Sequence, residues 1–317
     1  MRLNAWSWTK GYNIPPVAQG IYRRDYILLI VKSKGMEKVK IIGVPEHFNL
    51  PWHLALEEDA FQDRGIDLQW RDVPQGSGRM CQLLQEGKAD LGIVLTEGAL
   101  RSISQGNPCK IVQQFIASPL LWGIHVSGNS DKGSLEALER ARVAISRMGS
   151  GSHLMAYIHA QQRGWDPGSL EFDLIDDLDG AVAHLASGAD AYFMWEHFTT
   201  KPLVDNGTFK RLGDCPTPWP CFVVVATDAF IAKRPGVLKH ILEIINSYTL
   251  EFKDIPSIDR TLSNRYGQQL TDVRAWLAAT QWGQSQLDRQ TVGEVQEKLL
   301  GLHLIEGIKD PDLFLWP

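Results

Sequence analysis

Cysteine and clustered basic residues are both scarce in this sequence. It holds four cysteines in 317 residues, and no two of them form a C-x-x-C pair. Four cysteines are too few for a disulfide scaffold, and without C-x-x-C the usual zinc and redox motifs are excluded. Cys215 and Cys221 are the pair that an oxidising compartment would allow to form. The formal net charge is −5 and Lys and Arg do not cluster, so we expect no nucleic-acid partner, because neutralising phosphates needs a basic patch.

The sequence also lacks an apolar run long enough to cross a membrane. The longest early run, Ile27–Val31, falls far short of the ~20 residues that a membrane-spanning helix needs, so no membrane insertion is expected. Two arginines precede it, but Lys-Ser-Lys-Gly follows in place of a small-residue cleavage site, which argues against a signal peptide. Residues 1–35 have little periodicity and are predicted to be a poorly structured extension, with Met36 as an alternative start. As written, the chain is expected to be cytoplasmic.

Common catalytic and metal-binding motifs are missing as well. The sequence has no G-x-S-x-G, no H-E-x-x-H, no Walker loop and no His/Cys set at metal-ligand spacing. His153 and His159 stand six apart on one predicted helix, so they point to different faces and cannot hold one ion together. We therefore expect no metal and no cofactor. The nine histidines are interpreted as structural or solvated, except His47, whose loop is expected to face a cleft.

Strands and helices alternate from residue 38 onward. Apolar runs at 39–44, 66–70, 89–95, 142–146, 170–175 and 189–195 predict strands. Segments between them carry apolar residues at helical spacing, including a short predicted helix at 135–140. Strands that alternate with helices predict parallel β-α-β units, and therefore an α/β fold. Residues 234–317 show helical patterns only.

The order of elements occurs twice along the chain. A helix that ends at glycine, followed by Ala-Asp and a buried strand, occurs at Leu83–Leu95 and again at Leu185–Trp195. This predicts two similar α/β lobes joined by a hinge. We assign residues 36–125 and 228–317 to lobe one, and residues 126–227 to lobe two. Ligands of open α/β sheets bind beyond the carboxyl ends of the strands, so the cleft between the lobes is the predicted site.

Three blocks of sequence together resemble a known family. They are KVKIIGVPEHFNLPWHLALEEDAFQDRGIDLQW from residue 38, LLQEGKADLGIVLTEG from residue 83, and SRMGSGSHLMAYIHAQQRGW from residue 146, the last followed by GADAYFMWE. Their order and spacing resemble the type II periplasmic-binding-protein fold, particularly the nitrate/sulfonate/taurine and thiamine-precursor solute-binding proteins of ABC transporters. The resemblance covers most of 38–230. It implies a two-lobed fold with the helical C-terminal segment on lobe one, a small organic ligand, an ABC permease as partner and a periplasmic location. The chain departs from that family in having no export signal or lipoprotein cysteine.

Several predicted loops are expected to face this cleft. The loop at 148–152 precedes a helix, where unpaired N–H groups and serine hydroxyls can bind a ligand, although one serine can equally serve only as the helix cap. Carboxylates after three strands, at Glu46, Glu97 and Glu196, indicate a ligand with amino or hydroxyl donors. Tryptophans beside these loops can stack on flat rings. The candidate ligand-binding residues are Glu46, His47, Phe48, Trp52, Thr96, Glu97, Met148, Gly149, Ser150, Gly151, Ser152, Trp195 and Glu196.

Two functions fit these features. The first is a solute-binding protein that closes by hinge motion around a small organic molecule. The second, which the resemblance also implies, is a cytoplasmic biosynthetic enzyme of the menaquinone or thiamine-pyrimidine type. His47 or one of the three glutamates would then act as general base. The cysteine-rich iron motif of the yeast-type pyrimidine synthases is absent. Fold alone does not decide between them; we predict the binding protein and assign no catalytic residue.

Overall fold

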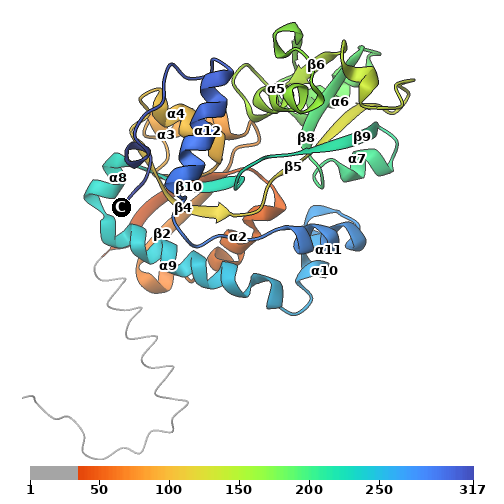
Figure 1. Cartoon of the computed structure of the whole chain (residues 1–317). Coiled ribbons are helices and arrows are strands. Elements are labelled where there is room, and N and C mark those ends of the chain that lie inside the picture. The colour runs from red at the N-terminus through yellow and green to blue at the C-terminus, as the bar shows by residue number, and fades with distance from the viewer. Residues whose placement is uncertain (1–34) are drawn as a thin grey trace, which may run out of the picture.

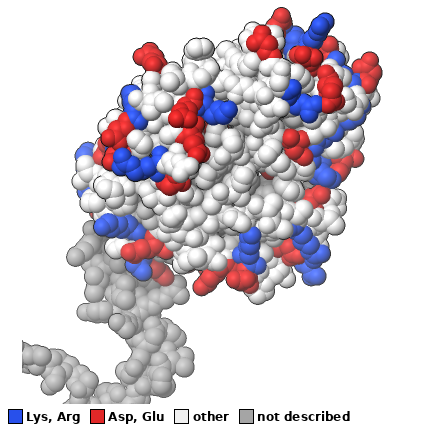
Figure 2. All heavy atoms as spheres, in the orientation of Figure 1, with Lys and Arg blue, Asp and Glu red and all other residues white. Residues whose placement is uncertain are grey.

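The computed structural model describes residues 35–317, so the predicted extension lies, apart from Gly35, outside the described residues. The described residues form two α/β lobes, each built on a five-stranded sheet (Figure 1). The predicted fold class is therefore confirmed. In the space-filling view of Figure 2, acidic and basic side chains are interspersed on the face shown, and the band between the lobes is largely uncharged. No helix within residues 35–317 is long and apolar enough to cross a membrane.

The first sheet has the strand order β2-β1-β3-β10-β4. Its strands are β1 (Glu37–Gly43), β2 (Ile66–Asp72), β3 (Leu91–Leu95), β4 (Cys109–Ile116) and β10 (Phe222–Thr227). β1 pairs in parallel with β2 and β3, whereas β10 is antiparallel to both β3 and β4. Every residue of β3 and of β10 is buried, which is typical of central strands covered on both faces.

The second sheet has the order β7-β6-β8-β5-β9. Its strands are β5 (Leu121–Ser127), β6 (Arg142–Ile145), β7 (Phe172–Leu174), β8 (Ala191–Glu196) and β9 (Phe209–Pro216). β6 is parallel to β7 and β8, and β5 is antiparallel to β8 and β9. Two expectations were too long here. The helix predicted at 135–140 is only a 3-10 turn, Glu136–Leu138, and the strand predicted at 170–175 is limited to the three residues of β7.

Local sequence explains where the helices between the strands begin and end. The helices between strands are α2 (Leu50–Glu57), α3 (Ser77–Gln85), α4 (Thr96–Ser104), α5 (Gly151–Arg163), α6 (Leu178–Ala186) and α7 (Lys201–Asp205). Ser150 caps α5 by accepting a hydrogen bond from the His153 backbone N–H, and Gly164 ends it in the left-handed conformation. Pro51 stands in the first turn of α2, where its missing N–H costs nothing.

The chain crosses between the lobes twice, at 117–120 and at 217–221. The two crossings are hydrogen-bonded to each other: Thr217 N–H donates to the Leu120 carbonyl at 2.9 Å, and Cys221 N–H donates to the Ser118 carbonyl at 3.2 Å. Sheet membership places β5 in lobe two and β10 in lobe one. The crossings therefore fall a few residues before the boundaries expected at 125/126 and 227/228.

The C-terminal segment is helical and packs on lobe one, as predicted. Its helices are α8 (Asp228–Lys233), α9 (Pro235–Glu251), α10 (Ile258–Tyr266), α11 (Leu270–Ala279) and α12 (Arg289–Gly301). α9 packs along α2, and α12 packs on α4 (Figure 1). The pair α10 and α11 reaches lobe two, where Lys201 of α7 forms an ion pair of 3.2 Å with Asp272. All four cysteines are buried and free, so Cys215 and Cys221 are unpaired here.

Candidate functional site

A small cavity lies between the two lobes, at the ends of strands from both sheets. Its volume is about 50 Å³, enough for a few water molecules at most. The residues that line it come from the ends of β1, β3 and β8, the start of α3, strands β5 and β10, and the loop before α5. They are Val44, Glu46, Gln75, Gly76, Ser77, Leu95, Leu120, Trp122, Ser146, Arg147, Ser150, Gly151, Ser152, Trp195, Glu196 and Phe222. The lobes thus stand close together, and any larger occupant requires them to open.

Two carboxyl groups face this cavity from opposite lobes. Glu46 follows β1 of lobe one, and Glu196 ends β8 of lobe two. Burial, and then repulsion from the Glu196 carboxylate, raise the pKa of Glu46 to about 8. Burial likewise raises the pKa of Glu196, against the effect of the Thr199 backbone N–H, which donates to its Oε2 at 2.6 Å. A positively charged group placed near both carboxyl groups would stabilise their ionised forms.

Aromatic rings and one unused donor complete the walls. Trp122 of β5 and Phe222 of β10 are buried, and Trp195 of β8 is half-buried and stacks on Phe193 at 5.4 Å between ring centroids. The Trp122 Nε1–H is buried and has no hydrogen-bond partner among the described residues. A buried donor without a partner costs about 1–3 kcal/mol.

The loop before α5 lines the cavity, and its serine hydroxyl groups already form hydrogen bonds within the loop. Ser150, Gly151 and Ser152 line the cavity. Ser150 caps the helix, its Oγ lies 3.0 Å from the Ser152 Oγ, and Ser152 accepts from the Ser146 N–H at 3.1 Å. A side chain at Gly151 would meet Leu95 and the Trp122 ring at 3.0 Å or less. The loop therefore shapes the cavity, and its hydroxyl groups act first on the loop itself.

Three residues expected to face the cleft lie in the core of lobe one instead. Trp52 is fully buried and stacks on Phe61. His47 is packed against Phe48 and Trp276, and burial lowers its pKa to about 3, so its ring is uncharged and shielded from solvent. None of Trp52, His47 and Phe48 lines the cavity. The turn after β1 folds inward, so that His47 and Phe48 pack on Trp276 of α11 while Trp52 packs on Phe61.

Thr96 and Glu97 lie at the crossings rather than in the cavity. The Thr96 Oγ1 donates to the Pro220 carbonyl at 2.5 Å, and Thr96 N–H donates to the Cys221 carbonyl at 3.0 Å. The Glu97 Oε2 accepts from the Trp219 Nε1 at 2.9 Å. Both residues therefore hold the second crossing to the start of α4. Sequence reasoning placed them at the correct strand end but could not show that residues 217–221 cover them.

Met148 and Gly149 lie just outside the cavity, on the surface of a neighbouring one. Met148 is 58% exposed. Trp122 and Phe222 line the cavity but were not among the candidate ligand-binding residues. Both stand on strands, β5 and β10, whose places in the sheets follow only from the fold. Within residues 35–317, no group of three or more His, Cys, Asp and Glu residues is arranged to hold a metal ion.

The fold is that of type II periplasmic-binding proteins. The Ca3427-like PBP family matches residues 122–215, which run from β5 to β9. The CA3427 gene product of Candida albicans, which defines a family with the generic periplasmic-binding-protein fold, superposes with a TM-score of 0.79 at 24% identity, over 88% of this chain and 94% of that one. No curated protein sequence matches the chain.

Two bacterial binding proteins share the fold at lower identity. The alkanesulfonate-binding protein SsuA of Xanthomonas axonopodis pv. citri, solved with MOPS bound, has a TM-score of 0.76 and 16% identity, over 89% of this chain and 99% of that one. The nitrate-binding protein NrtA of Synechocystis has a TM-score of 0.68 and 13% identity, over 87% and 84%. At these identities the similarity establishes the fold, and the ligand has to be inferred from the residues of the site.

Proposed function

We propose that this chain is a solute-binding protein of the ABC-transporter type, which captures a small organic ligand by closing its two lobes. The observation that carries the proposal is the pair Glu46 and Glu196, one carboxyl from each lobe on one cavity. Burial disfavours the charged form of both carboxyl groups, and the Glu196 carboxylate further disfavours ionisation of Glu46. A ligand that places a cationic or donor nitrogen between them relieves both effects and draws the lobes together.

The cavity walls add to this description of the ligand. Trp122, Trp195 and Phe222 offer faces for a flat or apolar body. A protonated amine beside tryptophan also gains from the negative face of the ring. We therefore infer an organic cation that carries a ring or an apolar group, and an ABC permease as the partner that receives it.

Retained ligand is the first thing to measure. Native mass spectrometry of gently purified protein, followed by release under denaturing conditions, would identify any bound compound. A stoichiometric amine or ring compound supports the proposal. An unmodified anion bound in the cleft would contradict it, because two carboxyl groups would repel that anion.

A matched set of probes tests the charge requirement directly. Calorimetric titration with benzylamine, benzyl alcohol and benzoate compares one ring with a positive, neutral and negative substituent. We expect benzylamine to bind best and benzoate least. The affinity for benzylamine should rise from pH 6 to pH 8. The cation favours ionised Glu46, and protons compete with it below the Glu46 pKa of about 8. Benzoate binding as tightly as benzylamine would refute the charge assignment.

Variants then test the position of the site. Glu196→Ala and Trp195→Ala are expected to weaken benzylamine binding about tenfold or more, since each removes a charged or stacking contact worth roughly 1–3 kcal/mol. Glu139→Gln, on an exposed turn of lobe two, is the control and should leave binding unchanged. If affinity survives both cavity changes with the fold intact, the site lies elsewhere.

The enzyme alternative has one observation in its favour. A carboxyl such as Glu46, with its pKa raised to about 8 in an enclosed cavity, is suited to general acid–base chemistry near neutral pH. His47 does not have that suitability, because it is buried away from the cavity. The mass-spectrometric experiment separates the two functions: a retained compound that is chemically altered on incubation would favour the enzyme.

A further inference from the structure

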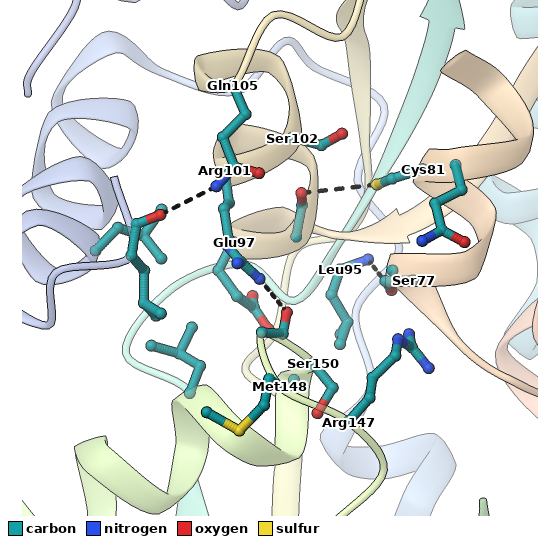
Figure 3. Close-up of a pocket in the computed structure, with 18 of the residues that line it drawn as sticks. Ser77, Cys81, Leu95, Glu97, Arg101, Ser102, Gln105, Arg147, Met148 and Ser150 are labelled. Atoms are coloured by element: carbon teal, nitrogen blue, oxygen red, sulfur yellow. Dashed lines mark hydrogen bonds between the residues drawn. The ribbon is translucent and has the colours of Figure 1, made fainter. Parts of the chain in front are cut away.

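A second and larger cavity adjoins the first. Its volume is about 290 Å³, and it is bounded by α3 and α4 of lobe one and by the loop before α5 of lobe two (Figure 3). Leu299 of α12 and Leu304 just after it also line the cavity. The two cavities share a wall formed by Ser77, Leu95, Arg147, Ser150 and Gly151. No part of the proposed function uses this space.

Two arginines from opposite lobes line it. In Figure 3, Arg101 extends from α4 and Arg147 from the loop before α5. Each crosses to the other lobe through a single backbone contact: the Arg101 Nη1 donates to the Gly149 carbonyl, and the Arg147 Nη1 donates to the Gln75 carbonyl, both at 2.6 Å. A guanidinium has five N–H donors, so most of their hydrogen-bonding capacity is unused.

Neither arginine is neutralised by a carboxylate. Among residues 35–317, no acidic oxygen lies within 4.0 Å of either guanidinium, whereas Arg142 and Arg289 each form two such pairs at the surface. The Arg101 Nε is buried and has no hydrogen-bond partner among these residues. Burial lowers the pKa of both arginines, with Asp176 acting on Arg147 only at longer range. Two partly desolvated positive charges without a counter-ion are costly unless an anion joins them.

Glycines make room for both guanidinium groups. A Cβ on Gly149 would stand 1.7 Å from the Arg101 Nη1, and a Cβ on Gly78 would stand 2.6 Å from the Arg147 Nη2. Gly149 also has a φ of +76°, which other residues rarely adopt. The backbone is therefore open at the two places where the arginines approach it.

One carboxyl group, Glu97, also borders the cavity. Its Oε2 is held by Trp219, its Oε1 is buried without a partner in the described chain, and burial raises its pKa to about 7. In its protonated form it donates a hydrogen bond instead of repelling an anion. Ser102, Gln82 and Gln105 are neutral and add further donors to the wall.

We propose that this cavity is a second binding site, which takes a small oxyanion such as phosphate between Arg101 and Arg147. Guanidinium groups bind phosphate and carboxylate oxygens through paired, charge-assisted hydrogen bonds. Because one arginine comes from each lobe, the bound anion bridges the lobes and stabilises their closed arrangement. The site adjoins the first cavity and shares Arg147 with its wall, but its anion does not depend on the identity of the cleft ligand.

Inorganic phosphate is the probe. Calorimetric titration of the full chain, at constant ionic strength and without any cleft ligand, should show saturable phosphate binding. Arg101→Gln and Arg147→Gln are each expected to reduce the affinity about tenfold or more, since each removes charge-assisted hydrogen bonds. Arg79→Gln is the matched control: Arg79 lies on α3 and is paired with Glu86 at the surface, so its removal should not change phosphate affinity. Acetate, with one charge, should bind more weakly than phosphate.

A purely structural role for these arginines predicts a different result. Loss of the two carbonyl contacts would lower the melting temperature but would leave phosphate affinity equal in all folded variants. Arg101→Lys keeps the charge and should retain part of the phosphate affinity while circular dichroism confirms the fold. No saturable phosphate binding to the wild-type protein, or equal affinity in both glutamine variants and the control, would overturn the proposal. Neither result would affect the cleft proposal, which is tested with benzylamine.

Discussion

Replacing Glu46 with glutamine is expected to remove a loss of stability that the wild-type protein undergoes as pH rises. In the folded state the pKa of Glu46 is raised from 4.5 to about 8. The native protein therefore holds a proton on this group between these values while the unfolded chain has released it. The free energy of unfolding then falls as pH rises through this window. Because glutamine does not ionise, the free energy of unfolding of the Glu46→Gln variant does not fall for this reason.

The size of the effect follows from the shift. Each unit of pKa corresponds to 1.36 kcal/mol, so between pH 5 and pH 8 the wild-type protein should lose about 4 kcal/mol relative to the glutamine variant. Repulsion from Glu196 supplies part of the shift. In Glu196→Gln, the loss should therefore be smaller and should end at a lower pH.

Urea denaturation at pH 5, 6, 7, 8 and 9 measures these differences. Glu139→Gln serves as the control, because Glu139 is exposed and its replacement should leave the pH profile of the wild-type protein unchanged. The reasoning is refuted if wild type and Glu46→Gln change in parallel between pH 5 and pH 8. That outcome would mean that the carboxyl is hydrated in solution and that the lobes stand open without ligand.

Two further predictions concern the cavity walls and the core. Gly149→Ala should destabilise the protein by about 2 kcal/mol or more in urea denaturation, because the new Cβ stands at a positive φ and collides with Arg101. Gly164→Ala is the control: its φ of +73° is similar but nothing lies within 4 Å of the new Cβ, so it should cost only about 1 kcal/mol. Equal losses of stability in the two variants would contradict the collision with Arg101. Trp52→Ala should lower the free energy of unfolding by about 3–5 kcal/mol in the same assay, because it opens a cavity in the core. The affinity of the folded protein for benzylamine should stay unchanged. A loss of that affinity would show that Trp52 contributes to the binding site.

The alternation of strands and helices was sufficient to predict the fold class. The predicted runs match β1, β2, β3, β6 and β8, because buried parallel strands read as short apolar runs between helical patterns. β9 (Phe209–Pro216) was not predicted, since its mixed polar sequence shows no clear period and its pairing with β5 comes from the tertiary structure. The segment at 135–140 consists of good helix formers (LEALER), but it is short and the turn it forms buries only Leu138, so packing does not extend it into a full helix.

Some of the candidate residues line the cavity, whereas others are covered by distant segments of the chain, and this difference has a physical basis. Residues at strand ends that point into the cleft, such as Glu46 and Glu196, follow from the parallel topology alone. Phe48 and Thr96 also follow strand ends, and Phe48 packs on Trp276 of α11. Their burial depends on the C-terminal helices and on residues 217–221, which fold back from more than 100 positions away. Local patterns cannot show which side of a loop such distant segments will cover.

The position of β10 has a consequence for synthesis on the ribosome. This strand lies between β3 and β4 in the first sheet but is encoded after all of lobe two. Until residue 227 has emerged, β3 and β4 have no partner between them, whereas residues 121–216 already contain every strand of the second sheet. We therefore expect the later-encoded lobe to fold first and the N-terminal half to wait for it, the reverse of the usual N-to-C order. A nascent chain arrested before residue 222 should accordingly protect lobe two, and not the first sheet, from protease.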